Sequence, residues 1–229
     1  MKYINGKTVP EHYTIDQLRK MLESSDMQTF VFACEALRNT KKPEAYQALK
    51  AKLQEKERYK YRYLLSVIFS FDESAELQEH FINALLSEDM LLVTTALEHL
   101  VHKNMWVTDE QILTCFEKHH NNLDGYYYQI LRGIARTELH TERMMKLLNC
   151  SRSDSAKIAV AECLTDFTTT ENYCDIYKLF ADSNVPKLRL EACRIARKFS
   201  RKDLLQAFAN DSDGHIRKYV ESFSAEHTS

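Results

Sequence analysis

Apolar positions recur along the chain in units of about thirty residues. In each unit a polar turn precedes an apolar residue, and small or apolar residues follow four and then seven or eight positions later. The first apolar residues are Phe30, Tyr61, Leu92, Tyr127, Ala156, Leu188 and Ile216, with a mean spacing of 31 residues. Because these offsets share one side of an α-helix, each unit predicts an amphipathic helix, here called a B helix. Another helix, the A helix, is predicted before each B helix.

Helix signals in the sequence fix approximate bounds for these elements. Thr14 with Gln17 and Thr108 with Gln111 fit capping boxes, and Pro43 and Pro186 fit first-turn positions. The predicted A helices are 15–24, 43–55, 74–87, 108–119, 140–149, 171–181 and 201–209. The predicted B helices are 26–39, 57–70, 89–102, 123–137, 153–167, 185–199 and 212–224.

Stacked hairpins are the expected architecture. A single pair of short helices cannot bury its apolar side alone, so each pair must pack on its neighbours. Only four glycines and three prolines occur in 229 residues, which disfavours sheet architectures rich in turns. The expected fold is all-α, a right-handed α-solenoid of about seven hairpins. We expect an N-terminal arm or cap over residues 1–13, one repeat domain over 14–225 and a disordered tail over 226–229.

The last two copies carry a more specific pattern. Asp182–Ala192 reads DSNVPKLRLEA and Asp211–Val220 reads DSDGHIRKYV. These segments resemble the second helix of HEAT and HEAT-like repeats, in which an Asp ends the turn and an Arg follows the first apolar residue. The other copies are supported by period and apolar pattern. Other two-helix solenoids, such as tetratricopeptide repeats, remain an alternative, although their W-x-x-L-G-x-x-Y pattern is absent. The resemblance implies that partners bind a concave groove lined by the B helices.

Charge is banded, although the net charge is only −2. Residues 41–62 hold eight Lys or Arg against three Glu, residues 63–100 hold seven acids and no Lys or Arg, and residues 186–202 hold seven Lys or Arg against one Glu. A central acidic belt disfavours wrapping of nucleic acid, because phosphate affinity depends on Lys and Arg. The six cysteines form no C-x-x-C pair, and the N-terminal stretch has no apolar segment, so a cytoplasmic protein without a membrane partner is expected.

Two HEAT-like enzyme families provide tests for chemistry. Deoxyhypusine hydroxylases hold iron with His-Glu pairs, whereas this chain has only the reverse order, Glu-His, as at Glu79-His80 and Glu98-His99. DNA alkylpurine glycosylases need a strongly basic concave face, which the acidic belt opposes. His99 and His102 could supply two zinc ligands, whereas a zinc site needs three or four. We therefore expect no catalytic residue, metal or cofactor.

Helical geometry predicts which side chains line the groove. Positions two, six and nine after each first apolar residue lie opposite the buried side of a B helix. The candidate binding residues are Phe32, Tyr63, Glu98, Gln129, Arg136, Ile158, Glu162, Leu190, Arg194, Arg197 and Lys218. Val67 and Thr165 occupy the same set of positions. Alternatively, strong curvature buries the aromatic members against neighbouring B helices.

Three functions remain open from the sequence. The first is a non-enzymatic scaffold or adaptor that binds a protein or peptide partner in the groove, with Arg194 and Arg197 available to an acidic segment. The second is a HEAT-like enzyme or nucleic-acid factor, similar to the bilin lyases or the alkylpurine glycosylases. The third is a structural protein that self-associates through its end repeats.

Overall fold

The computed structural model describes residues 2–4, 7–9, 13–53, 57–69, 75–100 and 107–226. The chain divides into two compact units, Met1–Val107 (unit 1) and Thr108–Ser229 (unit 2). Within the described residues the fold is all-α apart from two short strands, with thirteen α-helices and one 3₁₀ helix. Ser70, Val101, His102 and residues 227–229, on which some sequence predictions fall, lie outside the described residues.

Unit 1 contains a strand pair and three hairpins. Strands β1 (Lys2–Ile4) and β2 (Lys7–Val9) pair antiparallel, with Lys2 opposite Val9. The helices are α1 (Ile15–Met21), α2 (Met27–Thr40), α3 (Pro43–Lys50), α4 (Arg58–Phe69), α5 (Ala75–Leu85) and α6 (Met90–Leu100). The strand pair lies in the predicted N-terminal arm, whose role as a cap stays a prediction.

Unit 2 contains four hairpins. Its elements are α7 (Asp109–His119), η2 (Tyr127–Gly133), α8 (Glu138–Cys150), α9 (Asp154–Phe167), α10 (Tyr173–Ala181), α11 (Pro186–Lys198), α12 (Lys202–Gln206) and α13 (Gly214–Glu226). The predicted succession of A and B elements is confirmed, and so are the capping boxes at Thr14 and Thr108 and the first-turn prolines Pro43 and Pro186.

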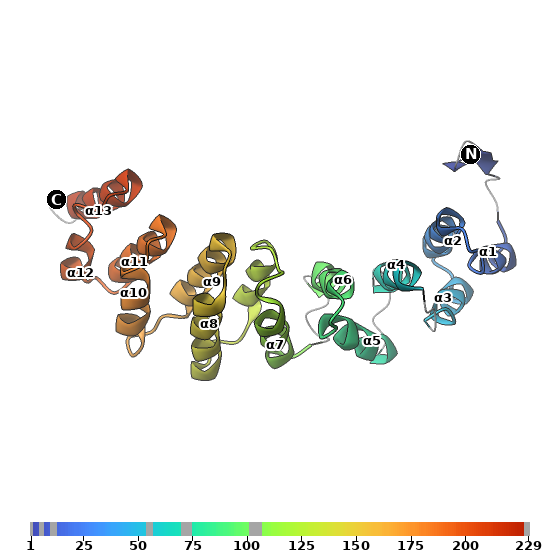
Figure 1. The fold of residues 1–229 in the computed structure, drawn as a ribbon, viewed down its shortest axis with the longest axis horizontal. Coiled ribbons are helices and arrows are strands. Elements are labelled where there is room, and N and C mark those ends of the chain that lie inside the picture. Colours follow the sequence, from blue (N-terminus) through green and yellow to red (C-terminus); the bar gives the residue numbers. More distant parts are fainter. Residues whose placement is uncertain are drawn as a thin grey trace. The chain divides into compact units, whose positions relative to one another are not determined.

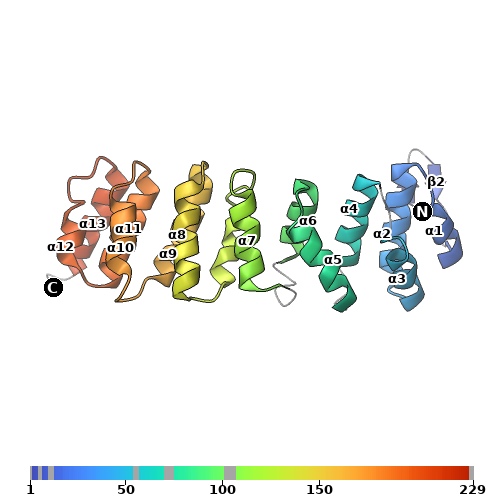
Figure 2. The same cartoon turned by 60° about the horizontal axis from the view of Figure 1, so that its bottom comes forward.

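Neighbouring hairpins stack in order within each unit. B helix α4 packs between α2 and α6, and α11 packs between α9 and α13. In unit 2 the A helices α8 and α10 lie below the B helices α9 and α11 in Figure 1 and in front of them in Figure 2. The two views therefore show an A layer and a B layer in unit 2, as a helical-hairpin repeat requires.

Buried aromatic rings join neighbouring elements, both between successive hairpins and within a hairpin. Phe69 of α4 meets Phe81 of α5 edge to face, with ring centroids 4.9 Å apart, and both rings are fully buried. In unit 2, Phe116 of α7 and Tyr128 of η2 form a similar pair at 4.7 Å. Burial of such rings dominates the hydrophobic stabilisation of a repeat.

The spacing of Asp and Arg that the last two copies share has a structural role. Arg189, which follows the first apolar residue Leu188, donates from Nε and Nη2 to the carboxylate of Asp211 in the turn of the next hairpin, both at 2.8 Å. Arg189 holds the pKa of Asp211 below its usual value through these hydrogen bonds. Arg58 and Asp89 link two hairpins of unit 1 in the same way. The motif therefore joins successive turns rather than facing a partner.

The fourth B helix was predicted wrongly. In place of an α-helix over 123–137, the structure has a 3₁₀ helix, and Tyr128 is buried rather than Tyr127. Tyr128, Leu131 and Ile134 are the buried side chains, and their spacing of three matches the three residues per turn of a 3₁₀ helix. Gly125 precedes this segment, and a Cβ there would lie 2.8 Å from the carbonyl carbon of Ser155. This close approach to the start of α9 fixes where the segment begins.

A similar shift occurs in α6. Val93 is fully buried, whereas the predicted first apolar residue Leu92 is only half-buried. Leu91, Leu92 and Val93 are all apolar, so the sequence offered three registers. Packing against α4 and α5 selected the one that buries Val93, Ala96 and Leu100.

Candidate functional site

The predicted binding residues all retain solvent exposure on the B elements or just after them. Glu98, Gln129, Arg136, Arg194 and Lys218 are exposed, and Phe32, Tyr63, Ile158, Glu162, Leu190 and Arg197 are half-buried. Because the two units are described separately, the candidates fall into two groups. Phe32, Tyr63 and Glu98 belong to unit 1, and the other eight belong to unit 2. Whether they bind a partner stays a prediction.

Two other residues at the predicted outward positions are buried. Val67 is 2% exposed, because α4 buries a wider arc, from Leu64 to Phe69, than a single stripe. Thr165 is 9% exposed, and its hydroxyl donates to the carbonyl of Ala161 at 3.0 Å. These two positions cannot contact a partner directly.

The unit 1 aromatics are partly engaged within the chain. The Phe32 ring meets the Tyr13 ring edge to face at 5.5 Å. The Tyr63 hydroxyl donates to Glu35 of the neighbouring B helix at 2.6 Å. Partial burial and this carboxylate raise the pKa of Tyr63. Contacts with Tyr13 and Glu35 therefore cover these two rings in part, an outcome between full exposure and full burial, the two alternatives that the sequence left open.

The unit 2 candidates lie on neighbouring B elements. We call the set Gln129, Arg136, Ile158, Glu162, Leu190, Arg194, Arg197 and Lys218 the B face of unit 2. Lys198, the last residue of α11, donates to the carbonyls of Thr165 and Thr168 at the end of α9, at 3.2 and 3.0 Å. The two helices therefore run in the same direction, and their equivalent positions lie side by side.

Several charges on the B face already have partners. Arg132 donates to Glu162 at 2.6 Å, which links η2 to α9. Arg194 donates to Glu191 at 2.6 Å, and their side chains are 48% and 5% exposed. Burial raises the pKa of Glu191, while Arg194 acts in the opposite direction and Glu162 and Asp166 add to the rise. Arg194 is therefore the outward counterion of a buried carboxyl group.

Two arginines of the B face sit on aromatic rings. The Arg136 guanidinium lies 5.7 Å from the centroid of the Phe167 ring. The Arg197 guanidinium lies 5.7 Å from Tyr219 and 5.5 Å from Phe223, both on α13. Such contacts hold a guanidinium plane in position over the ring.

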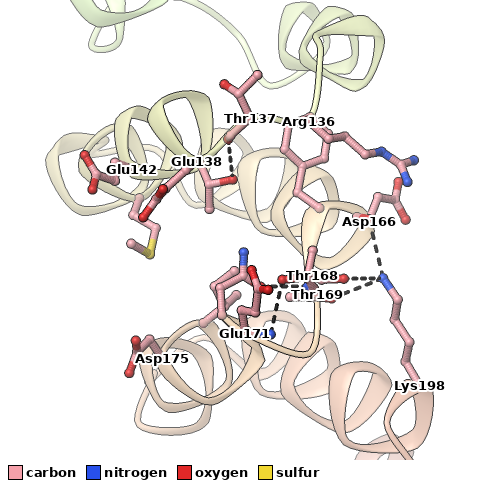
Figure 3. Close-up of a pocket in the computed structure, with 15 residues that line it drawn as sticks. Arg136, Thr137, Glu138, Glu142, Asp166, Thr168, Thr169, Glu171, Asp175 and Lys198 are labelled. Atoms are coloured by element: carbon pink, nitrogen blue, oxygen red, sulfur yellow. Dashed lines mark hydrogen bonds between the residues drawn. The ribbon is translucent and has the colours of Figure 1, made fainter.

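A cavity of about 520 Å³ lies in unit 2 beside this face. Figure 3 shows Glu138 and Glu142 of α8 on one wall, Asp175 of α10 opposite them, and Lys198 at the other end. Glu171, Arg136, Met145 and Ile176 are among its other lining residues. The carboxylates of Glu138, Glu142 and Asp175 make their end of the cavity favour cationic groups, whereas Arg136 and Lys198 lie at the other end (Figure 3).

Two of the acidic residues in this cavity also stabilise the helices on which they lie. Glu138 is in the first turn of α8 and Asp175 is in the first turn of α10, where carboxylates interact favourably with the helix dipole. The Lys198 ammonium group donates hydrogen bonds to Thr165 and Thr168 at the end of α9. Sequence reasoning did not find this cavity, because its walls come from four helices and two connections.

A charged cluster between α7 and α8 was also missed. Arg143 donates to Glu117 from Nε at 2.8 Å and from Nη2 at 2.7 Å, and it pairs with Glu110. Both ring nitrogens of His140 face acceptors, the Ala135 carbonyl at 2.7 Å and Glu110 at 3.2 Å. Glu110 and Glu117 are seven residues apart and so lie on the same side of α7, and this spacing was the sequence signal that could have predicted the cluster. The cluster joins two A helices.

The other chemical expectations concern cysteines, metals and membranes. Cys34, Cys115, Cys163 and Cys193 are buried, and desolvation raises the pKa of each thiol to about 12. Cys150 and Cys174 are exposed. Across the described part of the chain, no three His, Cys, Asp or Glu side chains gather as metal ligands. None of its helices has the length and apolarity to cross a bilayer.

Known proteins give little guidance to this chain. No protein-family model and no curated protein matches it. It is similar to a solved structure of the complex of CpcE and CpcF of phycocyanin lyase from Nostoc sp. PCC7120, with 16% identity, coverage of 96% of this chain and 79% of that chain, and a TM-score of 0.35. It is similar to an engineered protein at 16% identity, with coverage of 90% and 93% and a TM-score of 0.26. At these scores neither alignment assigns a role to a residue here.

Proposed function

We propose that the chain is a non-enzymatic repeat scaffold that holds a segment of a partner protein in a groove lined by the solvent-exposed side of its B helices. The observation that supports this most is the pair Ile158 and Leu190. They occupy equivalent positions on α9 and α11, which pack side by side, and each remains half-exposed with charged residues around it. Apolar side chains with a polar rim are typical of protein interfaces.

The charge pattern of the same face favours a protein partner over nucleic acid. Glu162 and Asp166 on α9 lie among the cations of unit 2. A phosphate backbone carries a negative charge at every nucleotide and is repelled by interleaved carboxylates. A peptide has no such constraint, because it can place neutral residues opposite them.

Partner capture from cells that produce the protein tests this function. We expect the double variant Ile158→Ala, Leu190→Ala to lose most of the proteins that the wild-type chain captures, because both apolar contacts are removed. The matched control is Leu139→Ala, which removes a 56% exposed apolar side chain from A helix α8 of the same unit. Capture is quantified by mass spectrometry, and thermal unfolding checks that each variant is folded.

Two outcomes of this experiment contradict the proposal. If the double variant captures the same proteins in the same yield as the wild type, then the B face does not hold the partner. If the purified protein instead carries a bound chromophore in its absorbance spectrum, or converts a substrate, the enzymatic alternative replaces the scaffold.

A further inference from the structure

The cations of the B face of unit 2 form a diagonal across three neighbouring elements. Arg136, in the connection after η2, lies over the ring of Phe167 at the C-terminal end of α9. Arg194 lies in the middle of α11, and Lys218 lies near the start of α13. Because α9, α11 and α13 pack consecutively, a segment that crosses them obliquely meets these three cations in turn.

The two ends of this diagonal are exposed cations, and Arg136 also lines the cavity of unit 2, where Figure 3 shows it beside Asp166. Among the described residues, neither Arg136 nor Lys218 has a carboxylate within ion-pair distance, and both side chains are exposed. Arg201 provides a contrast, since it also sits on an aromatic ring, at 5.7 Å from Tyr173, but is paired with Asp203 at 2.5 Å. Seating on a ring does not by itself neutralise a guanidinium, so Arg136 presents a positioned donor edge to solvent.

The part of the face between these ends is apolar or neutralised. Ile158 and Leu190 are half-exposed there, and Arg194 already shares its charge with Glu191. The complementary ligand therefore has acidic groups at its ends and apolar side chains between them. A guanidinium recognises a carboxylate through two parallel hydrogen bonds, which suits Arg136.

Resting on the proposed function, we infer that the B face of unit 2 binds an extended acidic peptide segment, with a carboxylate at Arg136, a carboxylate at Lys218 and apolar residues over Ile158 and Leu190. Such a segment crosses α9, α11 and α13 and so joins three hairpins. The interleaved acids Glu162 and Asp166 select against a continuous polyanion, and this makes a peptide rather than an oligonucleotide the ligand.

A fluorescein-labelled synthetic peptide, with a Leu and Ile centre flanked by Asp on both sides, tests the inference on the full chain by fluorescence anisotropy. We expect binding that weakens with added salt. Arg136→Gln and Lys218→Gln each lower the affinity about fivefold, and the double variant lowers it about 25-fold, because the two residues lie on separate elements. Arg194 is left unchanged, because its removal would leave the buried Glu191 without a counterion and could destabilise the fold.

The controls separate this inference from the function on which it rests. Lys146→Gln on α8 and Lys178→Gln on α10 remove exposed lysines from the A layer of the same unit and should leave the affinity unchanged. A peptide with Asn in place of Asp should bind much more weakly than the Asp peptide. Absence of binding by the Asp peptide at low salt, equal binding by the Asn peptide, or unchanged affinity of the double variant overturns the inference.

A labelled single-stranded oligonucleotide provides the last arm of the test. Tighter binding of the oligonucleotide than of the Asp peptide, lost in the double variant, would assign the cations to nucleic acid and overturn the inference. If the charge variants have no effect while Ile158→Ala, Leu190→Ala still abolishes partner capture, the scaffold function stands and only the acidic ligand is wrong.

Discussion

Several arginines that are prominent in the sequence form ion pairs within the chain. Arg189 forms an ion pair with Asp211 in the next turn, and Arg143 forms ion pairs with Glu117 and Glu110 on the neighbouring A helix. Arg194 compensates a buried carboxyl group. Arg136 and Lys218 lack such partners within the described residues and are therefore better probes of binding than Arg194.

Strain at a single residue gives a prediction on stability. Lys41 ends α2 with φ of 53°, in the left-handed region that favours glycine. We expect Lys41→Gly to stabilise the protein by up to about 1 kcal/mol, because glycine adopts this conformation without steric cost. Urea unfolding measures the change. Lys42→Gly is the matched control, since Lys42 has φ of −96° and should gain nothing from glycine.

The buried Glu191 predicts a dependence of stability on pH. Its pKa is raised by burial, so the folded state holds the proton at pH values where the unfolded chain has lost it. Stability from this group is therefore full below the ordinary Glu value of 4.5 and is lost as pH rises through the raised value.

Glu191→Gln keeps the size and stays neutral, so it should gain stability relative to the wild type as pH rises through this window. Chemical unfolding of both proteins from acidic to neutral pH measures the difference. A difference that is constant with pH would show that Arg194 fully offsets the burial of the carboxylate.

Elements follow the repeat pattern except where packing imposes another period. Residues 127–133 form a 3₁₀ helix longer than most, and its buried residues are spaced by three. Apolar residues at both Tyr127 and Tyr128 made either register available in the sequence. The close approach of Gly125 to Ser155 and the contact of Tyr128 with Phe116 selected the second.

Adjacent tyrosines test this register. Tyr128→Ala should destabilise unit 2 by about 3–5 kcal/mol, because it removes a fully buried ring. Tyr126→Ala should change stability by no more than about 0.5 kcal/mol, because Tyr126 is 74% exposed. Urea unfolding followed by circular dichroism compares the two variants. Equal costs would contradict the placement of Tyr128 in the core.

At the scale of the whole molecule, the chain forms two compact units with a boundary between Val107 and Thr108. Sequence composition is uniform across this boundary and predicted one domain over 14–225. In a repeat protein each hairpin depends mainly on its neighbours, so a set of hairpins can fold separately.

The fragment Thr108–Ser229 should therefore fold alone, with the helical circular dichroism expected from its seven α-helices and a cooperative urea transition. It should also bind the Asp-flanked peptide as the full chain does, since the B face of unit 2 lies within it. A fragment without cooperative unfolding would instead support the single domain predicted from sequence.

Local signals predicted much of the fold because they act within a helix or at its ends. The capping boxes at Thr14 and Thr108 and the prolines at Pro43 and Pro186 satisfy or remove backbone donors regardless of what packs nearby. The period of apolar residues placed all the helix pairs for the same reason. Exposure of Lys218 followed from helical geometry alone, whereas the burial of Val67 and Thr165 did not. Arg136 is exposed as expected, but it lies in the connection after η2 and not on the predicted α-helix.

By itself, the sequence determined the all-α class, the succession of hairpins and most helix ends, since these depend on spacing and on residues a few positions apart. Tertiary structure alone decided the 3₁₀ register at Tyr128, the burial of Glu191 behind Arg194, and the cavity between α8 and α10. Each of these depends on packing between different elements, such as Tyr128 of η2 against Phe116 of α7, and the identity of a residue does not reveal which side chains another element packs against it.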